Sequence, residues 1–177
     1  MKQEVFLKNL QMDNNDNHRV LLWKALEATS GTVIELGSGW GSTEHLRNYC
    51  KEKGREFLSF DNGEEWAKIH GSTFVPDNDW DSIDIKGSVL LLDHAPGERR
   101  GDDLARFKDK FEIIVAHDTE PVGAGNYGYE KHWKLFKYRA DVKTDGAWAT
   151  AVSNTIDLKD WKGFTAIGNG SKAHTIS

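Results

Sequence analysis

The segment 32–47 constrains the fold of this chain more than any other part of the sequence. A β-branched run at 32–36 leads into a turn with glycine at alternate positions, Gly37, Gly39 and Gly41, and a helical pattern follows at once. Glycines let the backbone approach a ligand with no Cβ in the way. The helix directs its free N–H groups and the positive end of its dipole at the turn. Strand, turn and helix together predict the first βα unit of a site for a nucleotide-type cofactor.

Strand and helix patterns alternate along the next part of the chain. Runs of Val, Ile and Leu that alternate with helices are typical of a parallel sheet covered on both faces. The strands are predicted at 32–36, 56–60, 73–75, 88–92 and 112–116. The helices are predicted from a cap at 14–16 to about 29, and at 42–53, 64–70 and 102–110.

Beyond the last of these strands the pattern changes. A helix is predicted around Lys131–Leu135, followed by two strands at 138–142 and 148–155. The turn between these strands contains Asp145-Gly146, a strong hairpin signal. The sequence therefore predicts an α/β fold, in which a doubly wound, mostly parallel sheet ends in an antiparallel C-terminal hairpin.

Length and composition favour a single domain at 1–177, divided into a polar arm at 1–16, a core at 18–158 and a tail at 159–177. A formal charge of −5 and a pI near 5.8 argue against a general nucleic-acid footprint. The one cysteine, Cys50, fits a reducing compartment, and no apolar run approaches the roughly 20 residues of a membrane span. We therefore expect a cytoplasmic protein that binds neither nucleic acid nor membrane, while its oligomeric state stays open.

The glycine turn could bind either a dinucleotide or a cationic ligand. A dinucleotide site with the GxGxxG spacing would place glycine or alanine at Ser42, and a carboxylate at Glu35 would repel a pyrophosphate. Glu35 suits a cationic ligand better. Asp61, at the end of the second strand, can accept both hydroxyls of a ribose, or cap the helix that follows Gly63.

Two motifs carry a family resemblance. The stretch 33–41 resembles the first motif of the class I S-adenosylmethionine-dependent methyltransferases, and 60–62 resembles their second. The C-terminal hairpin is also where that family places its antiparallel strand. The resemblance implies a Rossmann-like, seven-stranded methyltransferase fold and an enzyme that uses S-adenosylmethionine. The residues that it implies for cofactor binding are Glu35, Gly37, Ser38, Gly39, Gly41, Asp61, Asn62 and Asp93.

A second group of polar residues follows two buried strands. Asp93 and His94 come after the strand at 88–92, and His117 and Asp118 end the next one. Ligands bind at this rim of open α/β sheets. If the strands are neighbours, Asp93, His117 and Asp118 converge on one crevice and could hold a divalent cation, Mg²⁺ or Mn²⁺. The alternative is that these side chains only cap helices or bond across the rim.

This second group resembles the metal-dependent O-methyltransferases of the catechol type. In that family one strand ends in Asp-His, which matches Asp93-His94, and the next ends in Asp-Asn, where this chain has His117-Asp118. The family's catalytic lysine falls at Pro96. The proton acceptor would therefore be His94, His117 or Glu120.

Two further segments have a functional and a structural interpretation. The run Glu98-Arg99-Arg100 is either an exposed charged turn or a clamp for a substrate anion. The aromatic loop at 126–129, together with Trp133, is either a mobile lid or plain packing.

The leading functional prediction is methyl transfer from S-adenosylmethionine to the hydroxyl of a small-molecule partner, with or without a divalent cation. Three alternatives remain open at this point. The chain could be a nicotinamide-dependent oxidoreductase, a cofactor-binding module without catalysis, or a metal-dependent hydroxylase or hydrolase built on the same rim.

Overall fold

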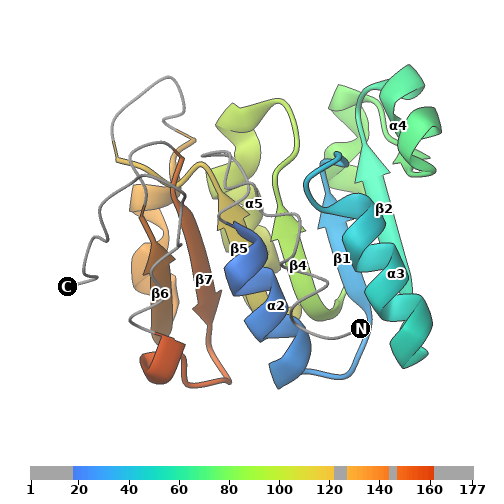
Figure 1. Cartoon of the computed structure of the whole chain (residues 1–177). Coiled ribbons are helices and arrows are strands. Elements are labelled where there is room, and N and C mark those ends of the chain that lie inside the picture. The colour runs from blue at the N-terminus through green and yellow to red at the C-terminus, as the bar shows by residue number, and fades with distance from the viewer. Residues whose placement is uncertain (1–17, 122–126, 144–146, 162–177) are drawn as a thin grey trace, which may run out of the picture.

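The structure is a computed structural model that describes residues 18–121, 127–143 and 147–161. Its centre is a seven-stranded sheet with the strand order β3-β2-β1-β4-β5-β7-β6 (Figure 1). Neighbouring strands from β3 to β5 run parallel, whereas β7 is antiparallel to both β5 and β6. The strands are β1 Val33–Leu36, β2 Phe57–Asp61, β3 Thr73–Phe74, β4 Gly87–Leu92, β5 Phe111–His117, β6 Tyr138–Val142 and β7 Ala149–Ser153. This sheet confirms the predicted fold class.

Helices cover both faces of the sheet. Figure 1 shows α2 and α3 on one face and α5 on the other. The α-helices are α2 His18–Ala28, α3 Thr43–Lys53, α4 Glu64–His70 and α5 Arg100–Phe107. The short 3-10 helices are η1 Asp77–Ser82, η2 Gly97–Arg99, η3 Tyr129–Lys131, η4 Trp133–Leu135 and η5 Lys159–Trp161.

The central strand β4 shows why its sequence is apolar without alternation. Val89 and Leu91 pack in the hydrophobic core under α2 and α3, and Leu90 and Leu92 pack in the core under α5. Successive side chains of a strand point to opposite faces, so a strand with a core on each side needs apolar residues at every position. The run 89–92 was recognised as a buried strand for this reason.

Register aligns three strand ends at one edge of the sheet. Leu36 of β1 pairs with Leu92 of β4, and Leu92 pairs with Ala116 of β5. The residues that follow are therefore neighbours at the carboxyl edge, namely Gly37, Asp93 and His117. This arrangement satisfies the condition under which the two polar groups were expected to meet.

Some predictions differ from the structure or fall outside it. The single helix predicted around Lys131–Leu135 is wrong, because the chain there forms the two 3-10 turns η3 and η4. The arm at 1–16, the Asp145-Gly146 turn and residues 162–177 of the tail lie outside the described residues, and the single-domain division stays a prediction. Within the described ranges, no helix is long and apolar enough to cross a lipid bilayer.

Candidate functional site

The glycine turn is held close to the loop after β4. Gly37 has a φ of +91°, and a Cβ added to it would lie 2.4 Å from the carbonyl oxygen of Asp93. Only glycine fits such a position. A Cβ on Gly39 would instead meet no atom within 4 Å, and Gly39 has no such positive φ. Packing explains the glycine at 37 and leaves the glycine at 39 facing open space.

Glu35 lies beneath the turn and fixes its shape. Its carboxylate accepts hydrogen bonds from the hydroxyls of Ser42, Thr43 (2.8 Å) and Ser59 (2.7 Å). Thr43 Oγ1 in turn accepts one from the Gly39 N–H at 2.8 Å. Complete burial raises the pKa of Glu35 to about 7, although the three hydroxyls oppose the shift. The family resemblance leaves Glu35 either to support the turn or to bind the ammonium group of the cofactor, and these hydrogen bonds fit support of the turn.

Asp61 closes the turn from the β2 side. One carboxylate oxygen accepts hydrogen bonds from the Ser38 N–H at 2.7 Å and the Ser38 hydroxyl at 2.9 Å. The other oxygen accepts one from the N–H of Gly63, the N-cap residue of α4, at 2.9 Å, and no side chain of the described residues makes a capping hydrogen bond to α4 itself. Asn62 turns away and donates to Asp77 at 2.5 Å. Ribose binding by Asp61 and cofactor contact by Asn62 stay predictions.

A cavity of about 360 Å³ lies between the glycine turn and the rim at β4 and β5. Its lining brings together many of the predicted cofactor and rim residues and adds His18, which sequence reasoning missed. His18 is buried, and its ring centre lies 4.7 Å from that of His117. No spacing signal in the sequence links the two histidines. The lining residues are His18, Gly39, Gly41, Ser42, Asp93, His117 and Asp118.

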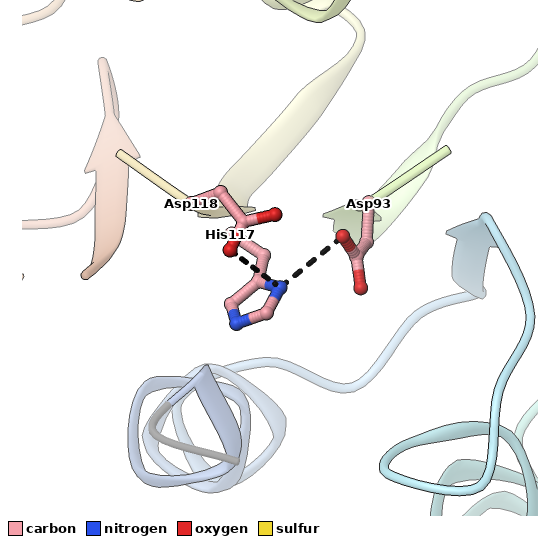
Figure 2. A group of neighbouring side chains, drawn as sticks. All are labelled: Asp93, His117 and Asp118. Atoms are coloured by element: carbon pink, nitrogen blue, oxygen red, sulfur yellow. Dashed lines mark hydrogen bonds and ion pairs between the residues drawn. The ribbon is translucent and has the colours of Figure 1, made fainter. Parts of the chain in front are cut away.

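The predicted rim residues meet as expected. Figure 2 shows the His117 ring between two carboxylates, with Nδ1 at 3.2 Å from Asp93 and 3.5 Å from Asp118. Burial would lower the pKa of His117, but its hydrogen bond to Asp93 and the two negative charges raise it. Burial would likewise raise the pKa of Asp93, yet His117 and Arg100 keep it below its usual value. His117 and Asp93 therefore stabilise each other's charged form.

The same three residues offer one ligand atom each, all within 4.8 Å of one another, as the predicted metal site requires. A cation is already present there, however. Arg100 Nη1 lies 3.0 Å from an oxygen of Asp93 and 3.1 Å from an oxygen of Asp118. A divalent ion holds oxygens at about 2.0–2.6 Å and would repel a guanidinium so close to it. The residues as arranged do not fit a divalent cation.

His94 and Glu120, two of the three predicted proton acceptors, lie outside the cavity. His94 is fully buried, bonds through Nε2 to Asp103 at 2.8 Å, and packs on Trp80. Glu120 accepts a hydrogen bond from the N–H of Trp148 at 2.9 Å. Both groups hold the protein together, which leaves His117 as the predicted acceptor that borders the cavity.

In the run 98–100 Glu98 is exposed, whereas Arg99 and Arg100 are bound to carboxylates of the protein and so form no anion clamp. Arg99 bonds to Asp103 at 2.7 Å and Asp81 at 2.6 Å, and Arg100 is buried against carboxylates. The lid interpretation is also wrong for Tyr129, which is buried, stacks on Trp133 and donates to the carbonyl of His117. In both segments, contacts with residues far away in the sequence determine whether a side chain is buried or free, and the sequence does not reveal those contacts.

Comparison with known proteins identifies the fold. No protein-family model and no curated protein matches the chain. Solved structures do: an S-adenosylmethionine-dependent methyltransferase from Archaeoglobus fulgidus has a TM-score of 0.53 at 12% identity, covering 85% of this chain and 97% of that one. The fold is that of the S-adenosylmethionine-dependent methyltransferases.

Two further methyltransferase structures are similar. The METTL16 methyltransferase domain has a TM-score of 0.52 at 13% identity and 83% coverage of each chain. Podospora anserina PaMTH1, solved with S-adenosylhomocysteine bound, has a TM-score of 0.51 at 9% identity, covering 77% of this chain and 76% of that one. These likenesses confirm the predicted methyltransferase fold, and the resemblance to the catechol-type metal site gains no support from them.

The comparison corrects the predicted partner. The sequence predicted a small-molecule partner and excluded nucleic acid. The likeness to the METTL16 methyltransferase domain overturns that exclusion, and nucleic acid becomes an acceptor class to be tested. The prediction had relied on net charge, which describes the whole surface and not the site where an acceptor binds.

Proposed function

We propose that this protein transfers a methyl group from S-adenosylmethionine to an acceptor at the carboxyl edge of its sheet. The observation that carries the proposal is Gly39, which lines the cavity and where an added Cβ would meet no atom within 4 Å, so that nothing in the fold requires glycine there. Such a gap admits a ligand against the backbone. The sulfonium methyl is already electrophilic, so the protein mainly has to hold donor and acceptor in line.

His117 is the proton acceptor in this proposal. Its Nδ1 faces Asp93, which favours the tautomer that has its proton on Nδ1 and a free lone pair on Nε2. Nε2 is buried and has no hydrogen-bond partner among the described residues, and the His117 side chain lines the cavity from which an acceptor would have to reach it. An acceptor hydroxyl or amine in the cavity would lose its proton to Nε2 as the methyl group arrives.

RNA is the acceptor class that we propose, on the likeness to METTL16 and on one surface feature beside the turn. Trp40 is 69% exposed and Trp66 40% exposed, with ring centres 6.2 Å apart. Unpaired bases stack on exposed aromatic rings. Because the chain carries a formal charge of −5, we expect stacking to outweigh phosphate contacts and the affinity to depend weakly on salt.

Donor binding is tested by calorimetry with S-adenosylhomocysteine and, separately, with NADH. We expect binding of the first alone. Asp61→Ala should weaken it at least about tenfold because Asp61 holds Ser38 in the turn and is the predicted partner of the ribose hydroxyls. Asp109→Ala, a change of an exposed carboxylate, serves as the control. Binding of NADH in place of S-adenosylhomocysteine would support the oxidoreductase alternative.

Transfer is tested with methyl-labelled S-adenosylmethionine and a pool of short single-stranded RNAs. We expect label in RNA from the wild type and a loss of about 10²-fold or more in His117→Gln and Asp118→Ala, both with S-adenosylhomocysteine binding retained. Trp40→Ala should lose RNA binding while Leu135→Ala, at a different exposed apolar site, keeps it. Cofactor binding without label in RNA would refute the acceptor class and favour a binding module.

A further inference from the structure

We propose that the guanidinium group of Arg100 is the resident cation of the rim, in the place where a divalent metal ion would otherwise neutralise Asp93 and Asp118. The proposal concerns charge and position at the rim and does not depend on which acceptor is methylated. It assigns Arg100 a positioning role, since Arg100 itself does not line the cavity.

The hydrogen bonds of Arg100 fix its guanidinium from every side. Nη1 lies between Asp93 and Asp118, at 3.0 and 3.1 Å from their oxygens. Nη2 donates to the carbonyl of Asp93 at 2.8 Å, and Nε donates to the carbonyl of His94 at 2.6 Å. The ring of Tyr127 lies over the group, with its centre 4.5 Å from the guanidinium carbon. A planar fork with this many partners cannot leave without breaking several charge-assisted bonds.

The position of Arg100 in its helix also calls for these carboxylates. Arg100 is the first residue of α5 and is only 7% exposed. A cation is unfavourable at the positive end of a helix dipole, and a buried cation needs a partner. Asp93 and Asp118 supply two negative charges to one guanidinium. The two carboxylates therefore explain why Arg100 is stable at the start of α5, where the helix dipole alone would disfavour a cation.

Arg100 also orients the groups that face the cavity. It holds the Asp93 carboxylate, whose same oxygen accepts from His117 Nδ1 at 3.2 Å. It also holds Asp118, which adopts a φ of +53°, a conformation that few residues other than glycine take. Loss of the guanidinium would leave Asp93 and Asp118 with less positive charge beside them, since His117 remains, and two carboxylates next to an imidazole bind Mg²⁺ or Mn²⁺ readily.

Manganese is the probe, and its binding is followed by electron paramagnetic resonance on the full chain. Wild type and Arg100→Lys, which keeps the charge, should bind Mn²⁺ at least about tenfold more weakly than Arg100→Met. Arg99→Met is the matched control, because Arg99 bonds to Asp81 and Asp103 and not to the rim. It should bind Mn²⁺ as weakly as wild type. If Arg100→Met does not fold, Arg100→Gln replaces it.

Two results would overturn the proposal. One is a wild-type protein that binds one Mn²⁺ as tightly as the neutral variant. The other is a folded neutral variant that gains no Mn²⁺ affinity, because the guanidinium would then not be what occupies the place of the ion. Both readouts are independent of methyl transfer, so failure here and failure of the proposed function are distinguishable.

Discussion

Gly37 and Gly39 stand two positions apart in one turn, and each lacks a side chain for a different reason. At Gly37 the backbone conformation and the carbonyl of Asp93 leave no room for a Cβ. At Gly39 a Cβ would stand free of protein atoms but at the border of the cavity. The fold therefore needs the first glycine, and the second is explained by the ligand that we propose.

Alanine at each position separates these two reasons. Gly37→Ala should lower the free energy of unfolding by more than about 3 kcal/mol, through a left-handed φ and a backbone clash. Gly39→Ala should change it by less than about 0.5 kcal/mol while weakening S-adenosylhomocysteine at least about tenfold. Urea unfolding and calorimetry measure the two effects. Equal cofactor affinity in Gly39→Ala and wild type would remove the observation on which the proposed function rests.

Glu35 should make stability depend on pH in an unusual direction. Its pKa is about 7 in the folded protein and near 4.5 when unfolded, so its contribution is complete below 4.5 and is lost as pH rises to about 7. That loss is on the order of 3 kcal/mol. Glu35→Gln, which stays neutral, should gain this much relative to wild type between pH 4.5 and 7.5 in urea unfolding. Parallel pH curves for the two proteins would show that Glu35 is ionised in the fold.

At the residue scale, the sequence predicted the residues of the glycine turn and of the rim, but not the side chains that bind to them. Gly37, Asp93 and His117 follow strands whose ends are visible as breaks in apolar runs. The role of Arg100 was not predicted because its partners, Asp93 and Asp118, follow β4 and β5, and such contacts between separate elements leave no local sequence pattern. One signal was available: a cation at the start of a helix opposes the dipole and indicates a buried carboxylate.

At the scale of elements, the strands differ greatly in what they contribute. β4 lies between β1 and β5 with a core on each face, whereas β3 is a two-residue edge strand with both side chains exposed. Removing apolar atoms leaves a cavity only where neighbours surround them on every side. The central strands are therefore expected to contribute most of the free energy of unfolding.

One substitution in each strand tests this difference. Leu91→Ala in β4 should cost about 2–5 kcal/mol of unfolding free energy, since Leu91 is fully buried. Phe74→Ala in β3 should cost less than about 1 kcal/mol, since Phe74 is 41% exposed. Thermal or urea unfolding gives both values. A loss at Phe74 as large as that at Leu91 would contradict the central placement of the core.

Element prediction succeeded where the pattern was periodic and failed where it was irregular. The parallel strands and the helices between them were identified because two-sided burial demands unbroken apolar runs. The segment 129–135 has helical composition, but its hydrogen bonds run from each residue to the third one back, as from His132 to Tyr129 at 2.8 Å. Stacking of Tyr129 on Trp133 and packing of Tyr129 against His117 decide that shape.

At the scale of the whole molecule, topology assembles the site from segments far apart in the chain. The order β1-β4-β5 places the ends of three strands side by side, although about 80 residues separate Gly37 from His117. α2 adds His18 to the lining of the cavity. Sequence motifs predict where each strand ends, but the strand order in the folded sheet is needed to show which residues face one another across the cavity.

The bonding of the glycine turn has a kinetic consequence. Gly37 donates to the carbonyl of Phe60, Asp61 holds Ser38, and Thr43 holds Gly39, so hydrogen bonds within the protein fix the shape of the turn. A receptor that is already ordered gives up little entropy on binding and needs no rearrangement first. In stopped-flow mixing followed by Trp40 fluorescence, the observed rate should therefore rise in proportion to cofactor concentration without levelling off. A plateau in the observed rate would show that a slow conformational change precedes binding, and that the turn is not ordered beforehand.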